Sequence, residues 1–87
     1  MSSFDYLVLD PAGLHARPAG LLVKSLAPFD AEMTISNGVK QVSAKKLFAV
    51  MGLGVKAGQT ITITAEGPQA FEALTAARAS LDENLAR

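Results

Sequence analysis

Residues 13–20 are Gly13-Leu14-His15-Ala16-Arg17-Pro18-Ala19-Gly20, and they hold the only histidine of the 87-residue chain. The apolar residues that follow at helical spacing are Ala19, Leu22, Val23 and Leu26. This i, i+3, i+4, i+7 pattern predicts a helix over residues 16–26 with one apolar face. Pro18 fits the first turn, where a residue has no intrahelical partner for an N–H. His15 is therefore expected at or next to the N-cap of this helix.

A histidine at the beginning of a helix has surroundings that suit an anion. The unpaired N–H groups of Ala16 and Arg17 and the positive end of the helix dipole would lie there, and the Arg17 side chain adds a permanent positive charge. A neutral imidazole is also nucleophilic and can form a covalent phospho-intermediate. The pattern indicates a phosphorylatable histidine, but a His-x-Arg sequence is also typical of an ordinary solvated loop, and spacing alone leaves both interpretations open.

Length and composition indicate one small folded domain, residues 1–87, with 49% hydrophobic and 18% charged residues. Eight basic and eight acidic side chains balance, which argues against nucleic acid as the main partner. The chain has no cysteine, no basic and apolar leader, and no run of ~20 apolar residues, so we expect a cytoplasmic protein that does not insert into a membrane. One histidine without cysteine leaves too few nitrogen or sulfur ligands for a transition metal. Phosphorylation of a histidine requires no bound cofactor, so none is expected.

Alternating or β-branched and aromatic segments predict strands over residues 4–9, 31–36, 39–42 and 60–65. The alternation places on one face of their strands the side chains of Phe4, Tyr6 and Val8, of Ala31, Met33 and Ile35, and of Ile61, Ile63 and Ala65. Asn37-Gly38 separates the second and third strands and favours a type I′ turn, because both residues tolerate positive φ. These two strands are therefore expected to form an antiparallel hairpin.

Two further helices are predicted. Residues 45–53 form a short one, with Ser43 as an upstream cap and Val50 as the core contact. Its other large apolar residues, Leu47, Phe48 and Met51, either fill the core of a small domain or leave an exposed patch. The last helix has Pro68 in its first turn. Its expected apolar face consists of Ala70, Phe71, Leu74, Ala77, Leu81 and Leu85.

The resulting order is β-α-β-β-α-β-α. A single four-stranded antiparallel sheet with three helices on one face accommodates this order. The expected fold class is therefore α+β, in the form of an open-faced sandwich.

Residues 13–19 also resemble the active-site segment of the HPr family, the histidine phosphocarriers of the bacterial phosphoenolpyruvate-dependent sugar phosphotransferase system. The order of elements and the Leu53-Gly54 pair after the second helix are similar to that family as well. The resemblance implies a carrier rather than a stand-alone enzyme. His15 would accept a phosphoryl group from phospho-enzyme I and pass it to sugar-specific IIA proteins or domains, and Arg17 would face the phosphate.

The resemblance further implies an apolar docking surface on the second helix, which favours exposure of its large apolar residues. We expect a partner surface with an apolar centre and a basic rim, on a monomeric protein. The centre would comprise Leu47, Phe48 and Met51, and the rim Arg17, Lys24, Lys45 and Lys46.

Two alternatives remain open. One is a nitrogen-branch phosphocarrier with other donor and acceptor proteins, and the other is a non-catalytic interaction module of the same fold. The chain also departs from the family pattern: where many Gram-positive members have a regulatory serine at the start of the second helix, Lys46 stands here. Since Ser43 lies three positions upstream, no serine phosphorylation is expected at that helix.

Overall fold

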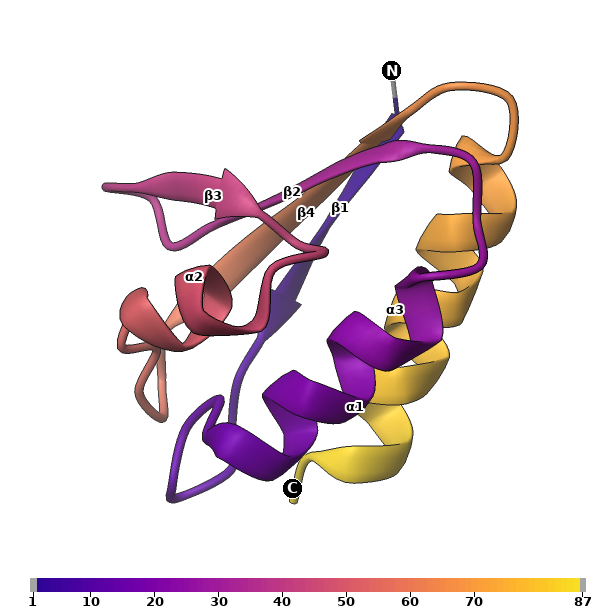
Figure 1. The fold of residues 1–87 in the computed structure, drawn as a ribbon. Helices are drawn as coiled ribbons and strands as arrows, with labels where there is room; N and C mark the ends of the chain where they lie inside the picture. Colours follow the sequence, from indigo (N-terminus) through magenta and orange to yellow (C-terminus); the bar gives the residue numbers. More distant parts are fainter. Residues whose placement is uncertain (1, 87) are drawn as a thin grey trace.

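The computed structural model describes residues 2–86, and over this range the chain forms four strands and three helices. These are β1 (Ser2–Leu7), α1 (Ala16–Leu26), β2 (Glu32–Ser36), β3 (Gln41–Ser43), α2 (Leu47–Gly52), β4 (Thr60–Glu66) and α3 (Ala70–Asn84). All neighbouring strands are antiparallel, in the order β1-β4-β2-β3. The helices cover one face of this sheet (Figure 1). The predicted α+β open-faced sandwich is confirmed.

The core lies between the helices and the covered face of the sheet. Phe4 pairs with Ile63, and Ile63 pairs with Ile35, so that β1, β4 and β2 contribute one row of side chains to this face. Ile61 and Ala65 of β4 are also buried, and the threonines between them point to the other side, as the alternation predicts. The helices and the segments that follow them contribute Leu22, Leu26, Val50, Leu53, Ala73, Ala77 and Leu81.

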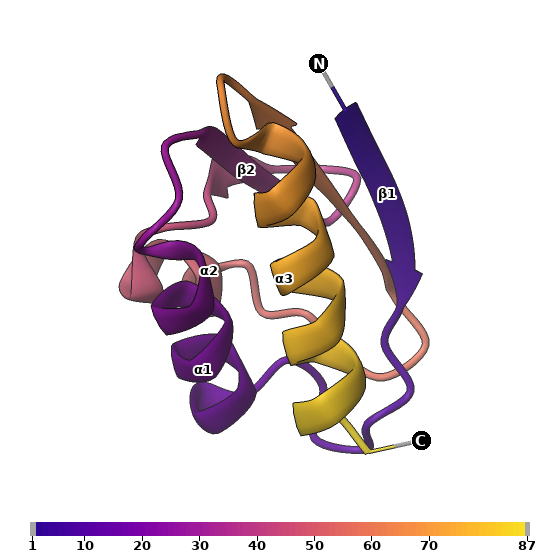
Figure 2. The ribbon, with the colours of Figure 1, turned by 90° about the vertical axis from the view of Figure 1, so that its right-hand side faces the viewer.

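The helices α1 and α3 run side by side in opposite directions across the sheet (Figure 2). The beginning of α1 therefore lies at the same end of the molecule as the end of α3. The connection from β1 to α1 is at this end too, so the segment that leads into α1 meets the end of α3, which is far from it in the sequence. This is the end that holds His15.

The boundaries of the first strand differ from those that the sequence predicts. The sequence predicts residues 4–9, whereas β1 begins at Ser2 and ends at Leu7. Its pairing with the segment before β4 nevertheless continues for one residue, because the Val8 N–H donates to the Gln59 carbonyl (2.9 Å) and the Gly58 N–H donates to the Val8 carbonyl (2.7 Å).

The β2–β3 hairpin is confirmed, but the predicted type I′ turn is wrong. Ser36 pairs with Gln41, so four residues rather than two connect the strands. Asn37 does not adopt the positive φ that this turn requires. Its side-chain oxygen instead accepts hydrogen bonds from the N–H groups of Val39 and Lys40, at 2.9 and 2.8 Å. The side chain thus stabilises a wider turn, and β3 begins two residues later than predicted.

The second helix is shorter than its apolar pattern predicts, and Ser43 is not its cap. The Ser43 hydroxyl accepts a hydrogen bond from the Lys45 N–H (3.2 Å), within the turn that precedes α2. The N-cap is Lys46, in extended backbone conformation (φ −117°, ψ 108°), and the helix spans residues 47–52 instead of 45–53. Val50 is buried, as predicted.

Two predictions for the last helix are wrong. Pro68 lies before the helix rather than in its first turn, because the N-cap is Gln69. Phe71 is 76% exposed rather than part of the apolar face. The buried positions of α3 are Ala73, Leu74, Ala77, Ser80 and Leu81. With 3.6 residues per turn, this stripe is centred near Ala77 and Phe71 lies about 120° away from it.

Candidate functional site

His15 is the N-cap residue of α1, as the sequence predicts. Its backbone is extended (φ −83°, ψ −178°), and its side chain makes no capping hydrogen bond. The first intrahelical hydrogen bond runs from the Ala19 N–H to the His15 carbonyl (3.0 Å). The N–H groups of Ala16 and Arg17 precede this bond, so both remain available to an anion at the beginning of the helix. The imidazole, 43% exposed, stands beside them.

The loop before α1 is fixed by one main-chain hydrogen bond within the loop and by another to the segment that follows α2. The Gly13 N–H donates to the Asp10 carbonyl (2.8 Å), and the Leu14 N–H donates to the Val55 carbonyl (3.0 Å). Leu14 is buried in the core. Gly13 has φ +69°, and a Cβ at this position would lie 2.1 Å from the Val55 carbonyl oxygen. Only glycine allows this close approach, which fixes the start of α1 against the segment that follows α2.

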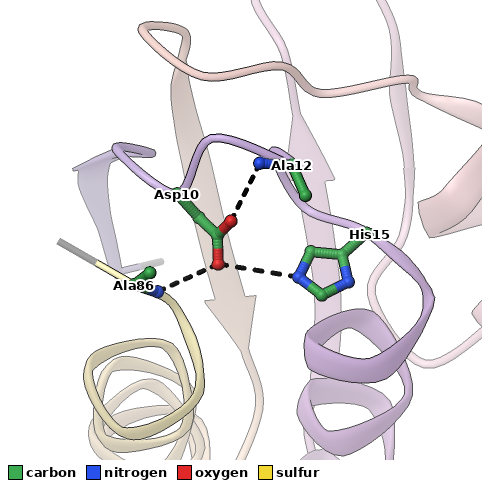
Figure 3. A network of polar contacts seen from close by, with 4 residues as sticks. All are labelled: Asp10, Ala12, His15 and Ala86. Atoms are coloured by element: carbon green, nitrogen blue, oxygen red, sulfur yellow. Dashed lines mark hydrogen bonds and ion pairs between the residues drawn. The ribbon is translucent and has the colours of Figure 1, made fainter.

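A carboxylate that sequence reasoning missed faces the His15 ring. Asp10 Oδ2 lies 3.5 Å from His15 Nε2, and Nδ1 points away from the carboxylate (Figure 3). The Ala12 N–H donates to Asp10 Oδ1 and the Ala86 N–H donates to Asp10 Oδ2, both at 2.9 Å. The bond to Ala12 is a local turn that an Asp-Pro-Ala-Gly sequence could have indicated. The bond to Ala86 joins residues 76 apart and has no such signal.

The surroundings of Asp10 keep its side chain ionised. The hydrogen bond from the Ala86 N–H is the largest influence that lowers the pKa of Asp10, and the bond from the Ala12 N–H is the next. Burial acts in the opposite direction, and the nearby His15 lowers the pKa further. The net pKa lies below the ordinary value of 3.8, because hydrogen bonds donated to a carboxylate favour its charged form.

This lowered pKa predicts a specific loss of stability in acid. Because the pKa of Asp10 is lower in the folded chain than in the unfolded one, its contribution is complete above the unfolded value of 3.8 and is lost as the pH falls through the folded value. We expect the free energy of unfolding to fall more steeply below pH 3.8 in the wild type than in Asp10→Asn. Urea unfolding from about pH 7 down to about pH 2 measures both slopes. Parallel curves for the two proteins would contradict this assignment.

The apolar residues predicted for the partner surface are exposed to different degrees. Phe48 is 86% exposed and Met51 is 39% exposed, whereas Leu47 is half-buried and packs against the core. Of the two interpretations of this helix, filling of the core holds for Leu47, and an exposed apolar patch holds for Phe48 and Met51. Of the three residues predicted for the apolar centre of the partner surface, only Phe48 and Met51 are therefore exposed. They lie on α2, which packs against α1 (Figure 2).

The basic residues predicted for the rim are spread over two elements. Arg17 is exposed in the first turn of α1, and Lys24 lies in its last turn, about 10 Å further along the axis. Lys46 is exposed at the N-cap of α2. The Lys45 ammonium instead donates to the Phe29 carbonyl (2.6 Å) and so holds the connection between α1 and β2. Arg17 is the rim residue nearest in the sequence to His15.

Residues 2–86 contain no helix that is both long enough and apolar enough to span a membrane. The same range contains no group of three or more histidine, cysteine, aspartate or glutamate side chains that could hold a metal ion.

Comparison with known proteins gives a consistent assignment. Residues 2–83 match the family model described as the PTS HPr component phosphorylation site. The phosphocarrier protein HPr of Vibrio cholerae is 46% identical over 71 residues, which cover 82% of this chain and 84% of that protein. The HPr of Mycoplasma capricolum is 37% identical over 81 residues, or 93% and 91% of the two chains.

The fold agrees with this assignment. A solved structure of the histidine-containing phosphocarrier protein from a mycoplasma superimposes with a TM-score of 0.92 at 35% identity, and the match covers 94% of this chain and 93% of that one. The order of the elements along the chain and the strand order β1-β4-β2-β3 are those of HPr structures. The chain therefore belongs to the HPr family of phosphocarrier proteins of the phosphotransferase system.

Proposed function

We propose that His15 is the residue that carries the phosphoryl group, with enzyme I as the donor and sugar-specific IIA proteins or domains as acceptors. The observation that carries this proposal is the exposed imidazole at the N-cap of α1 in a chain of the HPr family. Exposure suits a carrier, since the ring must reach a donor and an acceptor in turn. The cytoplasm is the compartment in which we expect this exchange, and the carrier itself is expected to act as a monomer.

The orientation of the ring supports Nδ1 as the nucleophile. Nε2 faces Asp10 and keeps its proton, which leaves the Nδ1 lone pair free to attack phosphorus. The new N–P bond forms as the bond between phosphorus and the donor breaks, and that electron pair leaves with the donor. The N–H groups of Ala16 and Arg17 and the Arg17 guanidinium stabilise the charge on the phosphoryl oxygens. Transfer to the acceptor is the same exchange in reverse.

Incubation with phosphoenolpyruvate and enzyme I tests this function. We expect one phosphoryl group per chain, labile in acid and stable in alkali, which disappears when a IIA acceptor is added. Intact-mass measurement follows both steps. Binding to enzyme I without any adduct would favour the interaction module instead, and an acid-stable adduct would contradict a phosphohistidine.

The exposed side chain of Phe48 is proposed as the apolar centre of the surface that enzyme I contacts, together with Met51. We expect Phe48→Ser to weaken binding to enzyme I by at least tenfold, because a large exposed aromatic side chain at the centre of an interface can contribute about 2 kcal/mol or more. The melting temperature should change little, since Phe48 is 86% exposed. Calorimetric titration with enzyme I measures the affinity.

Phe71→Ser is the matched control for this experiment. Phe71 is also exposed, but it lies at the beginning of α3, at the opposite end of the molecule from the start of α1 (Figure 1). The control should bind enzyme I like the wild type. Equal weakening by the two substitutions would show that α2 is not the docking surface.

A further inference from the structure

We propose that Asp10 is a positioning residue for His15: its carboxylate holds the imidazole with the proton on Nε2 and balances the positive charge that the ring gains when Nδ1 carries the phosphoryl group. This inference rests on the proposed function and deepens it. The segment that follows α3 also contributes to the site, because the Ala86 N–H donates a hydrogen bond that helps to hold Asp10 in place.

The Asp10 carboxylate is a fixed group, whereas the His15 ring is not. Asp10 is only 7% exposed, and each of its oxygens accepts a main-chain hydrogen bond at 2.9 Å, one from Ala12 and one from Ala86. The His15 side chain is exposed and makes no capping hydrogen bond. Among residues 2–86, the approach of Nε2 to Asp10 Oδ2 at 3.5 Å is the polar contact that the ring makes. The orientation of the ring therefore depends on this carboxylate.

The contact selects one protonation form of the neutral ring. A carboxylate only accepts hydrogen bonds, so it favours the tautomer with the proton on Nε2. The Nδ1 lone pair is then exposed on the side of the ring that points away from Asp10 (Figure 3). The opposite tautomer would place the lone pairs of Nε2 and Oδ2 against each other and would block Nδ1 with a proton.

The same contact becomes stronger during transfer. When Nδ1 bonds to phosphorus and the Nε2 proton stays, the neutral ring becomes positively charged. The separation of 3.5 Å is longer than the 2.7–2.9 Å that is typical of charge-assisted hydrogen bonds, so the contact has room to shorten once the ring is charged. Asp10 thus stabilises the phosphorylated ring from the side opposite the phosphoryl group.

The C-terminal segment completes this arrangement. The Leu85 N–H donates to the Leu81 carbonyl (3.0 Å) at the end of α3, and the Leu85 side chain is buried. These contacts place the next N–H, that of Ala86, on Asp10 Oδ2. The oxygen that faces His15 is therefore the one held by the C-terminal segment.

Asp10→Asn tests the proposal directly. Asparagine matches the size of the side chain, but its single oxygen cannot accept from the Ala12 N–H, the Ala86 N–H and Nε2 together. We expect the kcat of phosphoryl acceptance to fall about tenfold with little change in the KM for phospho-enzyme I. In the unphosphorylated protein, ¹⁵N NMR of the single histidine should show a loss of the Nε2–H tautomer. Asp30→Asn, the same charge change at an exposed site beyond the other end of α1, should alter neither quantity.

Ala86→Pro is a second test that leaves Asp10 in place. Proline removes the N–H that donates to Asp10, and the preceding residue Leu85 already has the extended conformation that a following proline requires (φ −101°, ψ 134°). We expect a fall in kcat of about threefold and a shift of the tautomer ratio in the same direction as in Asp10→Asn. Thermal unfolding checks that both variants are folded at the assay temperature.

The outcomes separate this inference from the proposed function. Wild-type kcat and an unchanged tautomer ratio in the two variants would overturn the role of Asp10 and leave the phosphocarrier assignment intact. A loss of equal size in Asp30→Asn would also overturn it, because net charge would then explain the effect. If the wild type itself accepts no phosphoryl group, the proposed function fails, and the tautomer ratio in Asp10→Asn still decides whether Asp10 orients the ring.

Discussion

Replacing His15 by alanine is expected to remove all phosphoryl acceptance while the protein stays folded. The substitution removes the nucleophile, and no other histidine or cysteine is present in the chain to replace it. The cost in stability should be within about 0.5 kcal/mol, as for most exposed sites, because the side chain is 43% exposed and caps no N–H group. Intact-mass measurement after incubation with phosphoenolpyruvate and enzyme I reports acceptance, and thermal unfolding reports stability.

His15→Gln is the control that keeps a polar side chain at this position but removes the nucleophilic nitrogen. Its side-chain amide can still donate a hydrogen bond toward Asp10, but it has no nucleophilic ring nitrogen. We expect this variant to bind enzyme I like the wild type and to carry no phosphoryl group. An adduct of wild-type stoichiometry in either variant would place the chemistry at another residue, and unfolding of His15→Ala would show that the side chain has a structural role.

Replacing Gly13 by alanine is expected to cost more stability than the same replacement at any other glycine of this chain. A Cβ would lie 2.1 Å from the Val55 carbonyl oxygen and 2.9 Å from the Lys56 Cα. Both neighbours are main-chain atoms, so the loop itself must move. The left-handed conformation of Gly13 (φ +69°) adds about 1–2 kcal/mol for an L-residue, and overpacking of this kind costs a further 1–3 kcal/mol. We expect a loss of about 3 kcal/mol, measured by urea unfolding.

Gly54→Ala separates the cost of the left-handed backbone conformation from the cost of the steric clash. Gly54 also has a left-handed backbone conformation (φ +61°), but a Cβ there would meet no atom within 4 Å. The control should therefore lose only the conformational term, about 1–2 kcal/mol. Equal losses in the two variants would show that the close approach to Val55 adds nothing. Phosphoryl acceptance should fall in Gly13→Ala alone, since its loop leads directly to His15.

The sequence predicted well wherever the pattern is local and repeats. The alternation of Ile61, Ile63 and Ala65 with polar residues reports which face of β4 is buried, because side chains along a strand point to opposite sides. The apolar spacing after residue 18 and Pro18 itself placed the beginning of α1 at His15 in the same way. These signals need only neighbouring residues, and the structure bears them out.

The sequence predicted poorly where a side chain competes with a standard turn or where exposure depends on distant neighbours. The Asn37 side-chain oxygen accepts hydrogen bonds from two main-chain N–H groups. These bonds stabilise a wider turn in place of the type I′ turn that Asn-Gly favours. Phe71 has helical spacing with Leu74, but the packing of α3 on the sheet leaves it outside the buried stripe. Leu47 and Phe48 are equally apolar neighbours, and only the position of α2 decides that one packs against the core and the other is 86% exposed.

The sequence by itself determined the order of the elements, the N-cap position of the single histidine and the family to which that segment belongs, because periodicity and a contiguous motif are properties of residues close together in the chain. Only the tertiary structure decided what the histidine faces. Asp10 meets His15 and the Ala86 N–H because the sheet brings the end of β1, the start of α1 and the end of α3 to one end of the molecule. A contact between residues 76 apart is a product of that packing, and no local pattern encodes it.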